Sequence, residues 1–191
     1  MLTLALLQCG GASAEEPPVV QQFADALVAD DAGNDRFPAE AGTRVVALPD
    51  DWALSRPGAD TPLWYRLRFD APGARQSNAA LGRLIERVCG NVAVKLNGQT
   101  LHAAGRMQDP IALDCEQPLL LPLPLALLQD SANTLDLRLA GYALEQVASR
   151  QRAAGLAAPQ IGAYDVLHAL QRETALVKTA LPQLASSALL M

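Results

Sequence analysis

The sequence predicts an all-β chain that folds as an antiparallel β-sandwich, with a short N-terminal lead-in and a C-terminal helix. Three observations lead to this prediction. Apolar and polar residues alternate in several short segments, turn-forming residues recur between them, and no long helical pattern separates them. Such a succession is typical of stacked antiparallel sheets, whereas a parallel sheet needs helices between its strands. Residues 44–162 are expected to form the sandwich.

The N-terminal 43 residues are expected to lie outside the sandwich. Residues 1–14 join a short apolar stretch to Ala12-Ser13-Ala14, a pattern typical of signal-peptide cleavage, although they contain no Lys or Arg. They predict a signal peptide that includes Cys9, and hence a periplasmic or otherwise extracytoplasmic chain. Residues 15–43 predict a lead-in, either a short helix or an irregular segment, because apolar residues from Val20 to Leu27 recur at helical spacing.

Strand patterns begin at residue 44. Arg44–Leu48 is rich in β-branched residues, and Pro49 ends it. In Leu63–Phe69 apolar side chains alternate with Trp64, Arg66 and Arg68, which predicts a strand with one buried face. Asn78–Arg87 is mixed and predicts a further strand.

The clearest local signal is a hairpin centred on Asn97-Gly98. Val92–Leu96 alternates apolar and polar residues, and Gln99–Leu101 begins the return strand. Asn-Gly suits a type I′ turn, because both central residues take positive φ and the twist of that turn matches the strands it joins.

Three further elements are expected before the C-terminus. Pro118–Pro124 is apolar but rich in proline, which cannot donate to a central ladder, so it predicts an edge strand or a crossing segment. Leu125–Leu128 predicts one helical turn. Thr134–Leu139 alternates again and predicts a half-buried strand.

Residues 163–191 change to a helical pattern. Tyr164, Leu167 and Leu170 recur at helical spacing, with Asp165 near the start. The last 17 residues hold one charge, Lys178, which is typical of a membrane span that has begun and been cut off. The alternative is an amphipathic helix packed on the sandwich.

The composition excludes several classes of partner and chemistry. The 191 residues carry 15 basic and 20 acidic side chains with no basic run, which argues against nucleic acid. Cys89 and Cys115 form an even pair once Cys9 is removed, and in an oxidising compartment they predict a disulfide worth about 3 kcal/mol; two buried thiols are the alternative. No metal or cofactor is expected, because His102 and His168 lack a ligand spacing with them.

Several segments, taken in order, carry a resemblance to a known family. They are Leu48-Pro49-Asp50-Asp51-Trp52, Trp64-Tyr65-Arg66-Leu67-Arg68-Phe69, Asn91 to Gly98, Pro118-Leu119 and Asn133-Thr134-Leu135. The order resembles the galactose-binding-like jelly-roll fold. It is similar to the periplasmic sensor module of bacterial membrane-bound histidine kinases and diguanylate cyclases, and to the sugar-binding domain of glycosidases of the β-galactosidase and β-glucuronidase type. The resemblance covers residues 44–170.

The resemblance implies a non-catalytic role, because the barrel that carries the catalytic carboxylates of such glycosidases is missing. The main hypothesis is a ligand-binding or signal-input domain of a membrane-bound sensor, tethered through its C-terminal segment. The alternative is a carbohydrate-binding module or the remnant of a glycosidase sugar-binding domain. A structural interaction domain is a third reading. The partners expected are a small molecule or carbohydrate, another periplasmic protein, the membrane, or a second copy in a homodimer.

Carbohydrate binders stack an aromatic ring on the sugar face and bond its hydroxyls with Arg, Asn or Asp. The candidate ligand-binding residues are Trp52, Trp64, Arg66, Arg68, Asn97 and Arg106. Each also has a structural explanation. Trp52 suits a core plug beside a loop, Trp64 a cap on the sandwich end, and Asn97 its turn, while the arginines suit a solvated face.

Overall fold

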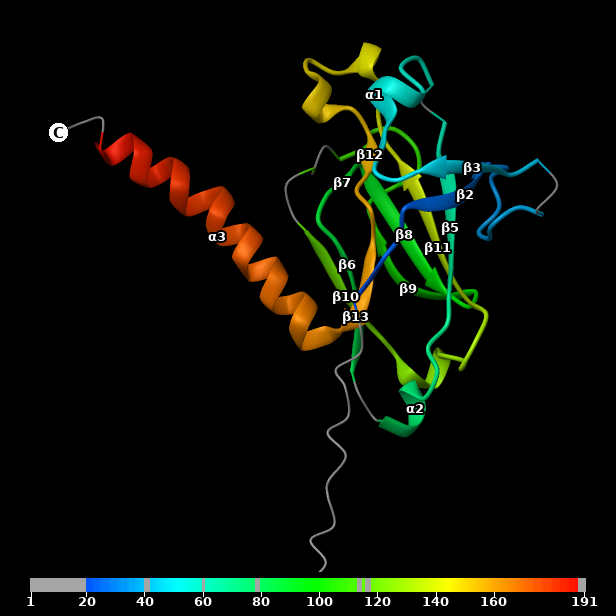
Figure 1. The fold of residues 1–191 in the computed structure, drawn as a ribbon. Coiled ribbons are helices and arrows are strands. Elements are labelled where there is room, and N and C mark those ends of the chain that lie inside the picture. The colour runs from blue at the N-terminus through cyan, green and yellow to red at the C-terminus, as the bar shows by residue number, and fades with distance from the viewer. Residues whose placement is uncertain are drawn as a thin grey trace, which may run out of the picture.

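The computed structural model describes residues 20–39, 42–59, 61–77, 80–112, 115 and 118–188, with the backbone alone for residues 77 and 177–188. The predicted signal peptide and Cys9 lie outside these residues. The described chain is an antiparallel β-sandwich followed by one long helix, which confirms the predicted fold class (Figure 1).

One layer is a six-stranded sheet with the strand order β3-β2-β5-β11-β8-β9. Its strands are β2 (Asp25–Asp30), β3 (Arg44–Ala47), β5 (Leu63–Phe69), β8 (Asn91–Leu96), β9 (Gln99–Ala104) and β11 (Asn133–Ala140). Every pairing in it is antiparallel. The predicted hairpin is confirmed, since β8 and β9 flank Asn97 with φ 49° and Gly98 with φ 82°.

The facing layer is a four-stranded sheet with the order β1-β13-β6-β10. It contains β1 (Gln21–Gln22), β6 (Leu81–Ile85), β10 (Leu119–Leu123) and β13 (Gln160–Ala163). Strand β10 lies at its edge, as the prolines predicted. A small third sheet at one end joins β4 (Asp50–Asp51), β12 (Gly155–Leu156) and β7 (Val88–Cys89).

Short helical turns connect the strands. They are α1 (Trp52–Ser55), α2 (Ala74–Ser77) and the 3₁₀ turns η1 (Leu125–Leu127), η2 (Leu144–Gln146) and η3 (Arg150–Arg152). The turn predicted over Leu125–Leu128 is confirmed by η1.

The core lies between the two large sheets and is mainly aliphatic. Alternate residues of β5, β8 and β11 point into it, among them Leu67, Val94 and Leu137. Leu81 and Ile85 of β6 join it from the opposite sheet. Burying this apolar surface is the main stabilising contribution to the fold.

The helix expected around Val20–Leu27 is wrong. This segment forms β1 and β2, and β2 pairs with β3 on one side and β5 on the other. The six-stranded sheet therefore begins before residue 44. The helical spacing of the apolar residues predicted the wrong element. Ala26 and Val28, which are two residues apart as in a strand, are buried in the core. Sheet pairing, more than local spacing, decides the conformation of so short a segment.

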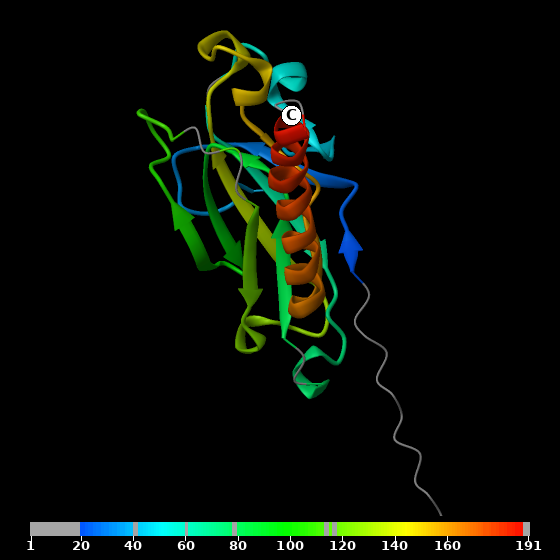
Figure 2. The ribbon, with the colours of Figure 1, turned by 90° about the vertical axis from the view of Figure 1, so that its left-hand side faces the viewer.

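The C-terminal helix α3 (Tyr164–Ala188) follows β13 with no intervening residue. Its start packs on β6, β13 and β10, and its far end stands away from the sandwich (Figure 1). Figure 2, turned by 90°, shows α3 running in front of the sandwich body. Gly82 permits this packing, since a Cβ there would lie 2.9 Å from the Tyr164 ring. Within the residues described, no helix is long and apolar enough to cross a membrane.

Candidate functional site

The structure disperses the six candidate ligand-binding residues instead of gathering them at one place. Trp52 and Trp64 are fully buried and belong to different clusters on opposite faces of the six-stranded sheet. Neither ring can therefore stack on a ligand from solvent. Trp52 is a core plug, as its structural explanation proposed, whereas Trp64 does not cap the sandwich end but lies with Ala29 and Phe37 on the outer face of the sheet.

Trp52 plugs the core at the end of the sandwich that carries α1. Its Nε1 donates to the Tyr65 hydroxyl at 2.6 Å, and this hydroxyl donates to Asp50 Oδ2 at 2.6 Å. Ser55 Oγ donates to the other oxygen of Asp50 at 2.6 Å. Burial and the neighbouring Asp50 carboxylate raise the pKa of Tyr65, because both disfavour a phenolate there.

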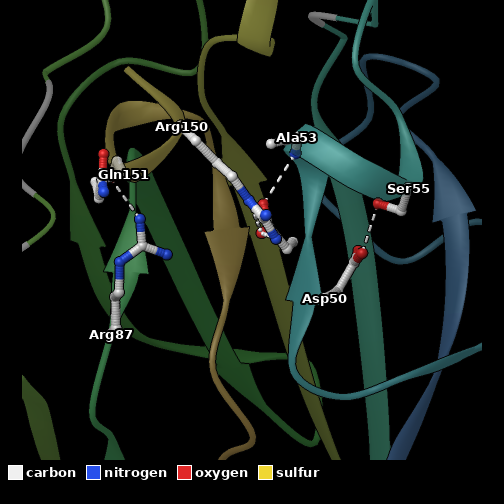
Figure 3. Close-up of polar contacts among 7 residues, drawn as sticks. Asp50, Ala53, Ser55, Arg87, Arg150 and Gln151 are labelled. Atoms are coloured by element: carbon white, nitrogen blue, oxygen red, sulfur yellow. Dashed lines mark hydrogen bonds and ion pairs between the residues drawn. The ribbon is translucent and has the colours of Figure 1, made fainter.

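The loops at this end are held by a second group of polar contacts (Figure 3). Asp51 caps α1 by accepting from Ala53 N at 3.0 Å, and it also accepts from Arg150 Nη2 at 2.7 Å. Arg87 Nη2 donates to the Gln151 backbone oxygen at 2.6 Å. These groups bind one another, so we assign this end a structural role: it fixes the segment that contains η3 against α1 and β7.

The outer face of the six-stranded sheet carries paired charges. Arg66 of β5 and Asp136 of β11 occupy directly paired positions and form two hydrogen bonds of 2.7 and 2.8 Å. Arg138 pairs with Asp31, which also accepts from Trp64 Nε1 at 2.9 Å. Lys95 pairs with Asp35.

The segment between β2 and β3 lies over part of this face. The Arg66 guanidinium carbon lies 4.1 Å from the centre of the Phe37 ring, within cation–π range. Phe37 is buried with Trp64 and Ala29 in a small cluster of its own. The sequence pattern showed the charged face of β5 but could not show that a distant loop covers it.

Asn97 is fully engaged in holding the hairpin to the end of β11. Its Nδ2 donates to the Leu127 backbone oxygen at 2.8 Å and to Asn133 Oδ1 at 2.9 Å. Its Oδ1 accepts from Thr134 N at 2.8 Å. The side chain therefore does more than satisfy the turn, and its polar atoms face protein partners.

Arg106 follows β9 at the far edge of the six-stranded sheet and is exposed. Its backbone oxygen accepts from Asn91 Nδ2 at 2.6 Å. Two strands, β8 and β11, lie between β9 and the β5 strand that carries Arg66 and Arg68, so Arg106 does not share a site with them.

Arg66 and Arg68 do share a site, a cleft of about 170 Å³ on the outer side of β5. Its lining residues are Phe23, Asp25, Ala26, Leu27, Arg66, Leu67 and Arg68. Asp25 and Arg68 are exposed, and Arg66 is half-buried. The cleft therefore presents two guanidinium groups and one carboxylate beside an apolar floor.

The cleft exists because two strands part. β2 pairs with β5 only from Leu27 to Asp30, whereas Asp25 and Ala26 pair with β3 alone. Before Asp25 the chain crosses from β1 in the other sheet. Phe23 N donates to the Pro159 backbone oxygen at 3.1 Å and fixes this crossing. Asp25 was missed at the sequence level because its segment was expected to lie outside the sheet, and alternation along a strand would have placed it on the outer face.

Two further expectations concern cysteines and metals. Cys89 and Cys115 are joined by a disulfide, with 4.1 Å between their Cα atoms. The part of the chain that the structure describes contains no group of three or more His, Cys, Asp or Glu side chains placed to hold a metal ion.

Comparison with known proteins supports the fold. No protein-family model matches the chain, and no curated protein matches its sequence. Among solved structures, it is similar to a β-glucuronidase from Ruminococcus gnavus at 12% identity and a TM-score of 0.55, over 78% of this chain and 30% of that one.

Two other solved structures are similar in the same way. One is a β-glucuronidase from an uncultured Clostridium species, at 10% identity and a TM-score of 0.55, over 82% of this chain and 31% of that one. The other is a glycosyl hydrolase family 2 member from Bacteroides cellulosilyticus, at 16% identity and a TM-score of 0.54, over 75% of this chain and 20% of that one. The chain spans less than a third of each, and identities this low show a shared β-sandwich fold alone.

Proposed function

We propose that this chain is a non-catalytic module that binds a carbohydrate or a similar small polyhydroxylated ligand in the cleft between β2 and β5. The observation that carries the proposal is the meeting of Asp25, Arg66 and Arg68 where the two strands part. The fold likeness points the same way, because the similar structures are of sugar-processing enzymes and one was solved in complex with D-glucuronic acid.

The chemistry of the cleft suits sugar hydroxyl groups. A hydroxyl can donate to the Asp25 carboxylate and accept from a guanidinium, so one carboxylate and two arginines can bind neighbouring hydroxyls. Arg66 is held in place by its two bonds to Asp136, which lowers the entropy lost when a ligand binds. The carbon atoms of Phe23 and Leu27 give the cleft an apolar floor for the sugar ring.

The volume of the cleft limits the size of the ligand that it can hold. Its volume of about 170 Å³ is below the several hundred Å³ that hold a drug-sized molecule. We therefore propose that one sugar residue occupies the cleft, and that any further residues of a glycan lie in solvent. The affinity expected for so small a contact is millimolar.

A titration with single sugars, followed by amide chemical shifts, tests the proposal. Glucose, galactose and glucuronate are added to the chain and to the variants Arg68→Ala and Asp25→Asn. We expect shifts centred on residues 23–27 and 66–68, with about tenfold weaker binding in either variant, because each loses a charge-assisted hydrogen bond. Arg172→Ala, on the exposed side of α3, is the matched control and should bind as the unmodified chain does.

Two results would refute this site. One is binding that survives both cleft variants, and the other is a set of shifts centred elsewhere on the sandwich. The absence of binding by all three sugars at high millimolar concentration would refute the carbohydrate class itself.

The signal-input role is the second function that we propose, and one feature of the fold favours it. The Phe23 N–Pro159 O bond ties the cleft to the residue just before β13, and β13 continues directly into α3. A ligand that moves the crossing at Phe23 would thereby displace the start of α3. Hydrogen exchange of residues 160–176 should slow when the cleft is occupied, and unchanged exchange there would refute the coupling.

Export remains a proposal that rests on residues 1–14 and on the disulfide, because disulfides persist in oxidising compartments.

A further inference from the structure

Arg83 lies at the centre of β6, on the face that points into the sandwich. Its neighbours Leu81 and Ile85 on the same face belong to the core, whereas Gly82 faces Tyr164 of α3. In the adjacent strands Arg83 is paired with Leu121 of β10 and Ile161 of β13. The guanidinium is therefore surrounded by apolar side chains between the two sheets.

This guanidinium is fully buried and unpartnered. Arg83 has no exposed surface, and its Nε, Nη1 and Nη2 atoms make no hydrogen bond in the part of the chain that is described. Burial lowers the pKa of Arg83 to about 9, so the side chain still carries its charge at neutral pH. A buried charge without a partner is strongly unfavourable, and proteins normally supply an opposite charge or hydrogen-bond acceptors.

A second titratable side chain, His102, lies on the inner side of the opposite sheet. His102 of β9 is paired with Val94, whose side chain lies in the core. A register shift next to this pair leaves Leu101 as an extra residue and turns β9 at this point. The His102 imidazole is half-buried, and both burial and the charge of Arg83 lower its pKa.

Neither side chain takes part in an ion pair within the described residues, and no carboxylate there contacts them. Arg83 presents only donors and a positive charge, and the His102 imidazole can add an N–H donor. Because β9 and β10 are the edge strands of their sheets and contact each other, this region lies next to an edge of the sandwich. His102 is half-buried, so part of this side chain reaches solvent at that edge.

We propose that Arg83 and His102 form an oxyanion-binding site inside the sandwich, which takes the carboxylate or sulfate-like group of a small ligand entering between β9 and β10. A guanidinium binds such a group through two parallel hydrogen bonds, and the imidazole N–H of His102 can add a third. The site is separate from the cleft at β2 and β5, which lies on the outer face of the other sheet, so either site can exist without the other.

The titration of His102 tests the site without any variant. The imidazole pKa values of His102 and His168 are measured by NMR in sodium chloride and in sodium sulfate at equal ionic strength. Because an anion bound beside His102 favours its protonated form, we expect its pKa to rise by about one unit in sulfate. His168, on α3, is the control within the same chain and should not change. Equal shifts of both, or no shift of His102, would overturn the proposal.

A variant separates the anion site from a merely buried arginine. Arg83→Met keeps the length and apolar stem of the side chain and removes its charge. In chloride, we expect Arg83→Met to melt at a higher temperature than the unmodified chain. Sulfate, acetate or glucuronate should raise the melting temperature of the unmodified chain but not that of Arg83→Met. Arg172→Met is the matched control and should keep that gain.

The three anions show which kind of oxyanion the site binds. Sulfate reports any oxyanion, acetate a lone carboxylate, and glucuronate a carboxylate on a sugar. An anion gain that persists in Arg83→Met would overturn the site. Neutral sugars should leave the His102 pKa unchanged whatever they do at the cleft, so failure of one proposal can be told from failure of the other.

Discussion

Trp52 and Tyr65 are joined through their polar atoms in the core, with the indole Nε1 of Trp52 donating to the Tyr65 hydroxyl at 2.6 Å. The same hydroxyl donates to the buried Asp50 carboxylate. One phenolic oxygen thus bonds two buried atoms, Trp52 Nε1 and Asp50 Oδ2, and it ties α1 to the centre of β5.

Replacing Tyr65 with Phe should therefore destabilise the protein more than the removal of a solvent-exposed hydroxyl would. The change leaves both the Trp52 donor and the Asp50 acceptor with an unmade hydrogen bond, and we expect a loss of about 2–4 kcal/mol in the free energy of unfolding. Urea denaturation measures it. Tyr164→Phe, on the half-buried start of α3, is the control and should cost under about 0.5 kcal/mol. Equal effects of the two variants would contradict the role given to the Tyr65 hydroxyl.

The raised pKa of Tyr65 predicts a specific sensitivity to alkaline pH. The unfolded chain releases the phenolic proton near pH 10, whereas the folded chain retains it to higher pH. The stability due to this group is thus fully present below pH 10 and is lost at about 1.4 kcal/mol per unit as the pH rises further. Unfolding free energies of the unmodified chain and Tyr65→Phe, compared from pH 8 to 11, should converge above pH 10. A constant difference would contradict the prediction.

We expect Asn97 to contribute to the free energy of unfolding in two ways, through its side-chain hydrogen bonds and through its positive φ. Asn97→Gly keeps the positive φ but loses the bonds to Leu127, Asn133 and Thr134, and we expect a loss of about 2 kcal/mol. Asn97→Ala also strains the turn and should lose roughly 1 kcal/mol more. Thermal or urea unfolding separates the two, with the exposed Gln99→Ala as control. A Gly variant as stable as the parent would mean that the turn alone explains Asn97.

Counting the reactive thiols tests whether the disulfide forms. The sequence contains 3 cysteines, so with Cys89 and Cys115 joined the denatured chain of residues 1–191 should show one reactive thiol, that of Cys9, before reduction and 3 after it. The double variant Cys89→Ala/Cys115→Ala should lose about 3 kcal/mol, since the bond closes a loop across a sequence separation of 26. Three reactive thiols before reduction would show that the bond does not form.

The candidate site was only partly foreseeable from the sequence. Arg66 and Arg68 were found because their alternation with apolar residues marks one face of a strand. Asp25 was not found, because the segment around it is short and its apolar spacing suits a helix as well as a strand. What decides between them is pairing with β5, whose residues lie more than 30 positions further along the chain.

The sequence by itself determined the local structure. The hairpin at Asn97-Gly98, the strand at Leu63–Phe69 and the helix from residue 164 follow from turn chemistry and from hydrophobic periods of 2 and 3.6 residues, which operate between near neighbours. Only the tertiary structure decided that β2 joins the sheet, that Trp52 and Tyr65 share one hydrogen bond, and that Arg83 faces Ile161 and Leu121 in the interior. These relationships join residues far apart in the chain, and they form because burying a common apolar core brings the strands together, an effect that no local pattern encodes.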